Sequence, residues 1–299
     1  MVRGTVAEQD RTVNRAIELG INYFDTAPSY GDGASETNLG RALRRTQAEI
    51  VVGTKFRIEP QDKKRIKVAI ASSLEASLRR LGRETVDILY LHNPIDVTGT
   101  DSLDPDLVLG EVAPAVERLR EQGKIRFSGI TAIGETQALH RIVTAATFDA
   151  AQIVHNLLNP SAAIEVPARF PAQNFSGLLQ SAQAADMGAI GITVLACGAL
   201  SGTEVRHPLA LRPDPIASEP DYDADITRAR QLQALVREGY AGSLLEAALR
   251  FAISSSAMTT VLVGCSSVDH LEAAATTIAK GPLPTATLSR LQTLWRDFA

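Results

Sequence analysis

The sequence has few cysteines, few aromatic residues and no long hydrophobic run. Its two cysteines, Cys197 and Cys265, exclude a disulfide framework, and no Cys or His spacing is that of a zinc or other metal site. The longest mostly apolar stretch, 187–200, is too short and too rich in glycine to span a bilayer. The first residues contain no apolar segment typical of a secretory signal. We therefore expect a cytoplasmic protein without membrane association.

Lysine is also scarce, since only six of the 30 basic residues are Lys. The 34 acidic residues outnumber the basic ones, and the formal net charge of -4 argues against non-specific nucleic-acid binding. Hydrophobic residues make up 45% of the 299 residues, which is enough to bury a full core. The length alone suggests two domains, but α/β barrels of this size fold as one. We predict a single domain over 1–299.

Apolar β-branched runs of strand length alternate with amphipathic helical stretches along the chain. The runs lack strict polar alternation, which is typical of parallel strands buried on both faces. The strand-like runs are 21–27, 49–55, 86–92, 125–131, 150–157, 189–196 and 260–265. The helical patterns lie near 8–19, 35–45, 63–81, 111–122, 135–146, 178–187, 225–252, 267–279 and 285–298. Such repeated units predict a parallel sheet, either closed as a barrel or open and doubly wound.

The motifs favour a (β/α)8 TIM-type barrel over an open sheet. The segment GDGASE after 21–27 does not have the G-x-G-x-x-G spacing of a doubly wound dinucleotide fold. Polar residues stand instead at the carboxyl ends of several strands, where such barrels carry their active sites. These residues are Asp25, Lys55, His92, Thr131, Asn156 and Cys265. A barrel needs eight strands and we identify seven, so we expect the first strand to be missing from this chain. An uncovered edge would favour a homodimer over a monomer.

Several residues outside this group have simpler expected roles. His155 is expected in the core, and Asp32, Glu36 and the acidic cluster 219–225 on the solvated surface. Ser35 and Asp225 are expected to cap helices. Four glycines are expected to end helices: Gly20, Gly82, Gly123 and Gly188. Long segments after strands are expected to set specificity, the proline-rich last one as a lid: 93–110, 157–177 and 198–224.

The densest group of polar residues is FDTAPSYG, 24–31, in which Asp25 ends a strand and Tyr30 follows on the loop. Lys55 and His92 end the next two strands. Neighbouring parallel strands lie about 4.8 Å apart, so the four side chains can meet. A phenol is a poor acid at neutral pH, and a nearby ammonium ion eases proton transfer to a carbonyl oxygen. Asp25 would balance the charge of Lys55, and His92 would donate a hydrogen bond to the carbonyl oxygen.

The block GINYFDTAPSYGDGASETNLGRAL, followed by VVGTK and DILYLHNP, resembles the aldo-keto reductase superfamily. The resemblance runs from about residue 7 to residue 280. It implies a (β/α)8 barrel that reduces aldehydes or ketones with NADPH, sometimes NADH. The family's catalytic tetrad falls on Asp25, Tyr30, Lys55 and His92, with Tyr30 as the general acid. The implied reaction on a small carbonyl substrate is hydride transfer to the carbonyl carbon, followed by protonation of its oxygen.

The resemblance also implies cofactor-binding residues, with partial matches. Thr131 matches a residue that holds the nicotinamide carboxamide, although its partner in the family is replaced by Ala132. Gln152 matches a second carboxamide-binding residue, and Leu195 stands where the family usually stacks a Tyr. The segment 261–274 resembles the cofactor-phosphate segment at a helix N-terminus, without its usual Arg or Lys. Its candidate residues are Gly264, Ser266, Ser267 and His270. NADP(H) is the family-level expectation, and NAD(H) stays open.

Two other functions remain to be weighed against a carbonyl reductase. Relatives carry an additional N-terminal segment with the first strand, so this chain could be a non-catalytic nucleotide-binding or regulatory relative. Alternatively, Lys55 could form a Schiff base in a barrel aldolase, but Tyr30 and Asp25 would then have no task. The presence of all four tetrad residues favours an enzyme.

Overall fold

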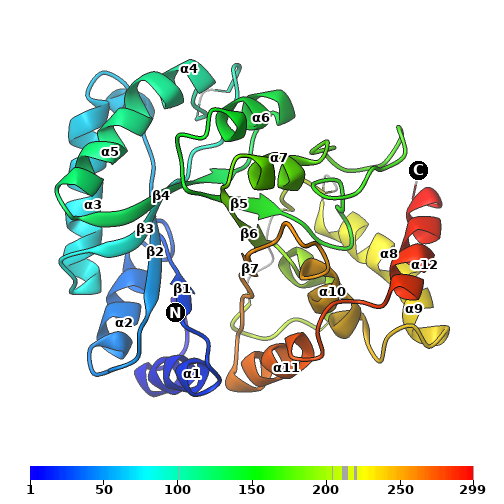
Figure 1. Ribbon diagram of the computed structural model, residues 1–299. Helices are drawn as coiled ribbons and strands as arrows, with labels where there is room; N and C mark the ends of the chain where they lie inside the picture. The colour runs from blue at the N-terminus through cyan, green and yellow to red at the C-terminus, as the bar shows by residue number, and fades with distance from the viewer. Residues whose placement is uncertain (100, 204, 211–214, 219–220, 299) are drawn as a thin grey trace. The chain divides into compact units, whose positions relative to one another are not determined.

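The computed structural model describes residues 1–299 apart from 100, 204, 211–214, 219–220 and 299. The chain divides into two compact units (Figure 1). Unit 1 consists of 1–151 and 267–271, and unit 2 of 152–266 and 272–299. The prediction of a single domain stays a prediction. Within the described residues, every helix is too short or too polar to cross a membrane.

In unit 1, strands and helices alternate along the chain. The strands are β1 (Tyr23–Asp25), β2 (Val51–Phe56), β3 (Val86–Leu91) and β4 (Ile125–Ala132), while β5 (Ala150–Val154) continues into unit 2. The helices are α1 (Val6–Glu18), α2 (Ala34–Leu43), α3 (Ile66–Leu81), α4 (Pro105–Leu107), α5 (Ala113–Glu121) and α6 (Thr136–Thr144). Strands β1, β2, β3 and β4 pair in this order, all parallel. The predicted alternation of parallel strands and helices is confirmed here.

The strand register decides which side chains of unit 1 share a face of the sheet. Lys55 pairs with Tyr90, and Tyr90 pairs with Gly129. A Cβ atom on Gly129 would lie 2.5 Å from the Tyr90 ring, and one on Gly53 would lie 3.1 Å from it. These two glycines therefore leave the space that the buried Tyr90 ring fills. Its hydroxyl group lies 2.8 Å from that of Tyr23.

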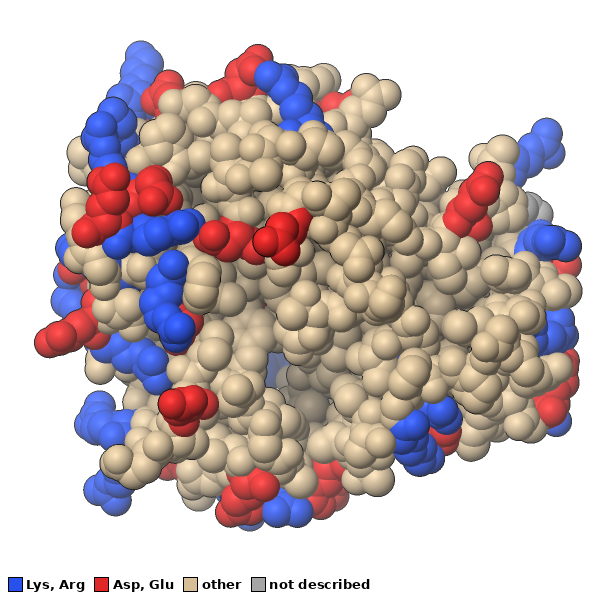
Figure 2. All heavy atoms as spheres, viewed as in Figure 1, with Lys and Arg blue, Asp and Glu red and all other residues tan. Residues whose placement is uncertain are grey.

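The helices of unit 1 pack in sequence beside the strands, α1 on α2, α2 on α3 and α3 on α5 (Figure 1). The contact between α2 and α3 is close, because a Cβ atom on Gly40 would lie 2.3 Å from the Leu81 carbonyl oxygen. Any larger residue at position 40 would push the two helices apart. On the face shown in Figure 2, basic and acidic side chains lie interspersed rather than in one patch of a single sign.

Unit 2 contains the rest of β5, and β6 (Gly188–Ile192) pairs there with β7 (Thr260–Val261) in parallel. Its helices are α7 (Leu178–Ala184), α8 (Tyr222–Leu232), α9 (Ala234–Arg237), α10 (Leu244–Ala252), most of α11 (Val268–Ile278) and α12 (Thr285–Arg296). The helix predicted over 225–252 is thus three helices. Gly239, with φ of +79°, follows α9 and separates it from α10.

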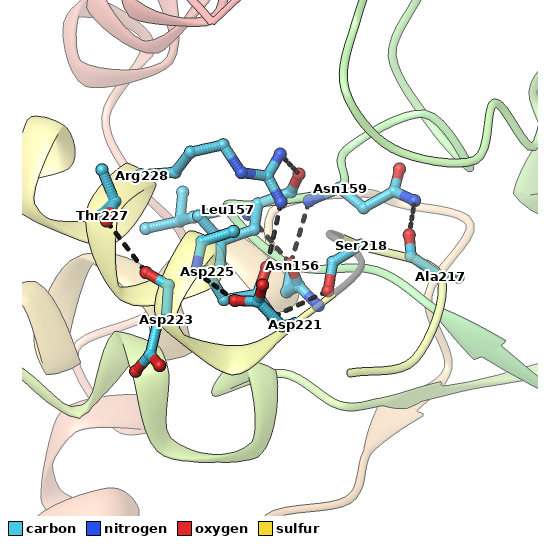
Figure 3. A network of polar contacts seen from close by, with 12 residues as sticks. Asn156, Leu157, Asn159, Ala217, Ser218, Asp221, Asp223, Asp225, Thr227 and Arg228 are labelled. Atoms are coloured by element: carbon cyan, nitrogen blue, oxygen red, sulfur yellow. Dashed lines mark hydrogen bonds and ion pairs between the residues drawn. The ribbon is translucent and has the colours of Figure 1, made fainter. Parts of the chain in front are cut away.

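Figure 3 shows a polar network in unit 2 that ties α8 to the loop after β5. Arg228 donates hydrogen bonds to Asp225 (3.0 Å) and to the Leu158 carbonyl oxygen (3.3 Å), and Ser218 donates to Asp225 (2.7 Å). Asp225 is buried, so the expectation that the 219–225 cluster lies on the solvated surface is wrong for this residue. Residues 219–220 of the cluster lie outside the described residues. Asn156 has a structural role here, since its amide donates to the Thr193 carbonyl oxygen at 2.9 Å.

Helix ends agree with the sequence at some positions and differ at others. Gly20, Gly82 and Gly123 have positive φ after helices, as expected. Gly188 instead begins β6, and the positive φ before it belongs to Asp186. Ser35 lies inside α2, whose N-cap is Gly33. Asp221 rather than Asp225 caps α8, by accepting a hydrogen bond from the Ala224 N–H. In both helices the residue predicted as the cap lies inside the first turn, and the observed cap precedes it in the chain.

The core of unit 2 contains the ring of His155, as expected from the sequence. This side chain is 1% exposed and stacks on Phe251 with 4.7 Å between ring centroids. Its Nδ1 atom has no hydrogen-bond partner among the residues that the structure describes. Phe251 in turn contacts Trp295, whose indole N–H donates to the Leu157 carbonyl oxygen at 2.9 Å. His155 is thus a packed core residue with one unsatisfied nitrogen.

Replacing His155 with Phe is expected to weaken the acid sensitivity of folding. Burial lowers the pKa of His155 to about 4. Between pH 6.5 and 4 the unfolded chain therefore binds a proton that the folded chain does not, so the free energy of unfolding falls as pH falls. His155→Phe keeps an aromatic ring against Phe251. On going from pH 8 to pH 5, its free energy of unfolding should therefore rise by about 2 kcal/mol relative to that of wild type. Denaturant unfolding at both pH values measures this, with His140→Gln as the control. Equal pH dependence in wild type and His155→Phe would contradict it.

Candidate active site

An ion pair between neighbouring strands forms the centre of the site in unit 1. Asp25 is the last residue of β1, and Lys55 lies near the end of β2. The Lys55 ammonium group contacts the Asp25 carboxylate and also donates to the Thr26 carbonyl oxygen at 2.9 Å. The Lys55 side chain is only 1% exposed. A buried ammonium ion requires such partners, because its transfer from water would otherwise be very unfavourable.

Tyr30 and His92 lie beside this ion pair. Tyr30 stands on the loop between β1 and α2, and its ring centroid lies 4.8 Å from the Lys55 ammonium nitrogen. The rings of Tyr30 and His92 meet edge to face, with centroids 6.1 Å apart and an interplanar angle of 84°. Tyr30 is 38% exposed, so its phenol is open to solvent while Lys55 is not. The four predicted residues are therefore brought together within one unit.

The His92 ring is neutral at physiological pH. Burial, followed by the positive charges of Lys55 and Arg57, lowers the pKa of His92 to about 4. A neutral imidazole carries one N–H donor rather than two. His92 can therefore donate one hydrogen bond to a bound oxygen, but it is a weak source of protons at neutral pH.

Hydrogen bonds beyond the end of β2 hold the backbone beside His92. The His92 N–H donates to the Phe56 carbonyl oxygen at 2.9 Å. The buried Asn93 side chain then bonds to both backbone groups of Ile58, accepting from its N–H at 2.8 Å and donating to its carbonyl oxygen at 2.9 Å. These bonds connect the chain after β2 to the chain after β3 and so continue the alignment of the two strands. They fix Arg57, which lies between Phe56 and Ile58, next to His92.

A second charged group, which the sequence analysis missed, supports the loop that carries Tyr30. Glu36 on α2 is fully buried, and its carboxylate accepts from the Thr54 hydroxyl and from Arg80 of α3, both at 2.6 Å. The expectation that Glu36 is solvated is therefore wrong, while Asp32 is exposed as expected. The available signal was helical spacing, since Glu36 shares its face of α2 with the buried Leu39 and Leu43.

Three cofactor candidates belong to unit 1, and their roles stay predictions. Thr131 lies near the end of β4, is 3% exposed and is two residues from Gly129, hence on the face that contacts Tyr90. The Ser267 hydroxyl accepts from the His270 N–H at 3.2 Å, as a capping residue of α11 does. His270 is exposed.

The other four candidates belong to unit 2. Gln152 lies in β5 and is 1% exposed. Leu195 follows β6 and packs against two hydrophobic clusters. Gly264 is exposed, with open space around its Cα, and Ser266 is partly exposed. The lid expected over 198–224 stays a prediction, and residues 204, 211–214 and 219–220 of it lie outside the described residues.

Both cysteines are partly buried free thiols. Burial raises the pKa of Cys265 to about 11, and burial also raises the pKa of Cys197. Both thiols are therefore protonated at neutral pH and are poor nucleophiles. The described part of the chain contains no group of three His, Cys, Asp or Glu side chains arranged to hold a metal ion.

Comparison with known proteins identifies the family. The sequence model of the Aldo/keto reductase family matches residues 4–296. The chain belongs to this family. It is 28% identical over 306 residues to L-galactose dehydrogenase of Arabidopsis thaliana, covering 98% of this chain and 86% of that protein. It is 26% identical over 286 residues to L-glyceraldehyde 3-phosphate reductase of Escherichia coli K12, covering 88% and 77%.

Solved aldo-keto reductases share the fold. The holo form of an aldo-keto reductase from Bacillus halodurans superimposes with a TM-score of 0.72 at 22% identity, covering all of this chain and 89% of that one. An aldo-keto reductase from Klebsiella pneumoniae, in complex with NADP and acetate, gives 0.68 at 20% identity and covers 97% and 86%. The predicted (β/α)8 fold is confirmed, with seven strands among the described residues.

Proposed function

We propose that this aldo/keto reductase catalyses NAD(P)H-dependent reduction of an aldehyde or ketone, or oxidation of the corresponding alcohol, with Tyr30 as the general acid. The observation that carries this proposal is the proximity of Tyr30 to both Lys55 and His92, with Asp25 on the ammonium group. A non-catalytic relative has no need to keep a buried ion pair beside an accessible phenol. An aldolase would need the Lys55 amine free to attack a carbonyl carbon, whereas this nitrogen contacts Asp25 and donates to the Thr26 carbonyl oxygen.

The four residues divide the work of carbonyl reduction. Reduced nicotinamide, when bound, supplies the hydride that the carbonyl carbon receives. The Tyr30 hydroxyl then gives its proton to the carbonyl oxygen, and the Lys55 ammonium group stabilises the phenolate that remains. Asp25 holds the Lys55 side chain in place. The neutral His92 donates a hydrogen bond that orients the carbonyl oxygen and stabilises charge developing on it.

The donor set of the chain fits a nicotinamide dinucleotide. In unit 1, the nearly buried Thr131 offers a hydroxyl group that can bond to a carboxamide. In unit 2, the nearly buried Gln152 offers an amide with the same capacity. Ser266 and Ser267 stand at the N-terminus of the eleven-residue helix α11, where backbone N–H groups favour phosphate. Residues 264–270 contain no Lys or Arg. NADPH as the preferred cofactor therefore rests on the family and on the NADP complex of the Klebsiella pneumoniae protein. A cytoplasmic location and a monomeric or homodimeric state stay predictions.

Titration of the purified chain with NADPH and NADH tests the proposal. Binding to the protein should change the fluorescence of the reduced nicotinamide ring. We expect micromolar or tighter affinity for at least one cofactor, and tighter binding of NADPH than of NADH. Addition of simple aldehydes should then oxidise the bound cofactor, and the loss of absorbance of the reduced nicotinamide measures this reaction. Absence of binding to both cofactors would refute the proposal. Binding without turnover of any aldehyde or ketone would favour the non-catalytic alternative.

A further inference from the structure

Arg57 stands at the open edge of the candidate site. It directly follows β2, in which Phe56 pairs with Leu91 of β3, so Arg57 lies opposite His92. The hydrogen bond from the His92 N–H to the Phe56 carbonyl oxygen (2.9 Å) extends that register by one step. The two bonds between the Asn93 side chain and Ile58 then fix the chain on the far side of Arg57.

Strand geometry places the Arg57 side chain on the catalytic face. Side chains two residues apart along an extended chain point to the same side, and paired residues of parallel strands do so too. Arg57 therefore shares its side with Lys55, as His92 shares its side with Tyr90. Phe56 and Ile58, the neighbours of Arg57, are each 1% exposed and point to the opposite, packed side. The position of Arg57 beside His92 also agrees with its contribution to lowering the pKa of that residue.

The guanidinium group of Arg57 has no partner in the part of the chain that the structure describes. No hydrogen bond or ion pair with the described residues holds it, and the residue is exposed. Two nearby cations are held within the protein, because Arg65 pairs with Asp62 at 2.8 Å and Lys63 donates to the Ser102 carbonyl oxygen. Within the site, the carboxylate of Asp25 is already engaged by Lys55. The guanidinium group of Arg57 is thus accessible to an anion that enters the site.

We propose that the site takes an anionic carbonyl compound, one that carries a carboxylate or a phosphate group, and that Arg57 binds this group. The inference rests on the proposed reductase function. The planar guanidinium group forms paired hydrogen bonds with either type of anion. The rigid backbone around Arg57 limits the entropy lost on binding.

Matched pairs of substrates test this proposal. The ratio of kcat/KM for 4-oxobutanoate to that for butanal measures the preference for a carboxylate, and the ratio for glyceraldehyde 3-phosphate to glyceraldehyde measures that for a phosphate. At least one ratio is expected to be about 10 or more at low salt and to decrease as ionic strength rises. Arg57→Gln should reduce that ratio about tenfold, and Arg57→Lys should restore part of it because the charge returns without the planar fork. Arg65→Gln, the matched control, should keep the wild-type ratio.

The outcomes separate this inference from the proposed function. Turnover of both neutral aldehydes with ratios near 1, or with ratios that Arg57→Gln does not change, overturns the role of Arg57 and leaves the reductase intact. Absence of turnover for all four compounds, together with absence of cofactor binding, overturns both. A high carboxylate ratio with a phosphate ratio near 1 identifies a carboxylate substrate, and the reverse result identifies a phosphate.

Discussion

Tyr30→Phe is expected to lower kcat for aldehyde reduction by about 100- to 10,000-fold, the usual contribution of a positioned general acid. The substitution removes only the hydroxyl group, so the ring contact with His92 and the packing of the ring over Lys55 remain. Cofactor affinity should change little, because the phenolic proton is needed only when the carbonyl oxygen acquires charge. Single-turnover reduction of an aldehyde by the enzyme with NADPH bound measures the loss directly.

The matched control for this experiment is Tyr240→Phe. The hydroxyl group of Tyr240 in unit 2 has no hydrogen bond within the described part of the chain, so its loss should leave kcat unchanged. Activity of Tyr30→Phe above about a tenth of wild type would contradict the role of Tyr30 as the general acid. A comparable loss of activity in Tyr240→Phe would show that the assay responds to general damage instead.

The sequence was sufficient to predict that the four side chains of the candidate site lie together, because polar residues follow the strand order. Asp25, Lys55 and His92 stand at the ends of three consecutive apolar runs, and parallel strands that pair in chain order bring such ends together. The specific block around Tyr30 then supplied the fourth residue through its resemblance to a family. Strand lengths were less predictable, since the runs 21–27 and 260–265 form ladders only over Tyr23–Asp25 and Thr260–Val261.

Buried charges were not predictable from the sequence in the same way. Glu36 and Asp225 each have polar neighbours in sequence, and only the spacing of Glu36 with Leu39 and Leu43 indicated a buried face. Their burial depends on their partners: Arg80 is 44 residues from Glu36, and only the packing of α3 on α2 brings it there. For Asp225, the partner Arg228 is one helical turn away, but its second contact, the Leu158 carbonyl oxygen, is 70 residues distant. Burial of a charge is a tertiary property.

Arg57 illustrates a different limit. The sequence shows an arginine after a strand, which is ordinary, and only the register identifies it as the residue opposite His92. Asn93 shows the same limit, because its two bonds to Ile58 depend on the alignment of β2 with β3. Residues that act through an alignment between strands become visible once the pairing is known.

Arg80→Ala is expected to lower the free energy of unfolding by about 3–5 kcal/mol, because it leaves the fully buried Glu36 carboxylate without its cation. Glu36→Ala should cost less, about 2–4 kcal/mol, since the Arg80 side chain is 29% exposed and can turn to water. Denaturant unfolding of wild type and the two variants at one pH measures both differences.

The effect of Arg80 should extend to catalysis, because its side chain lies against the loop that carries Tyr30. A Cβ atom on Gly33, which has φ of +83°, would lie 2.6 Å from the Arg80 Cδ atom, so the two are in close contact. Folded Arg80→Ala should therefore show a lower kcat. Arg290→Ala, which breaks the exposed Arg290–Glu238 pair in unit 2, should change stability little and leave kcat unchanged. The double variant Glu36→Gln with Arg80→Met removes both charges and keeps side chains of similar size. If it recovers the free energy of unfolding but not kcat, the contact of Arg80 with the loop positions Tyr30. If the single variants lose no more stability than Arg290→Ala, the buried pair does not stabilise this part of the site.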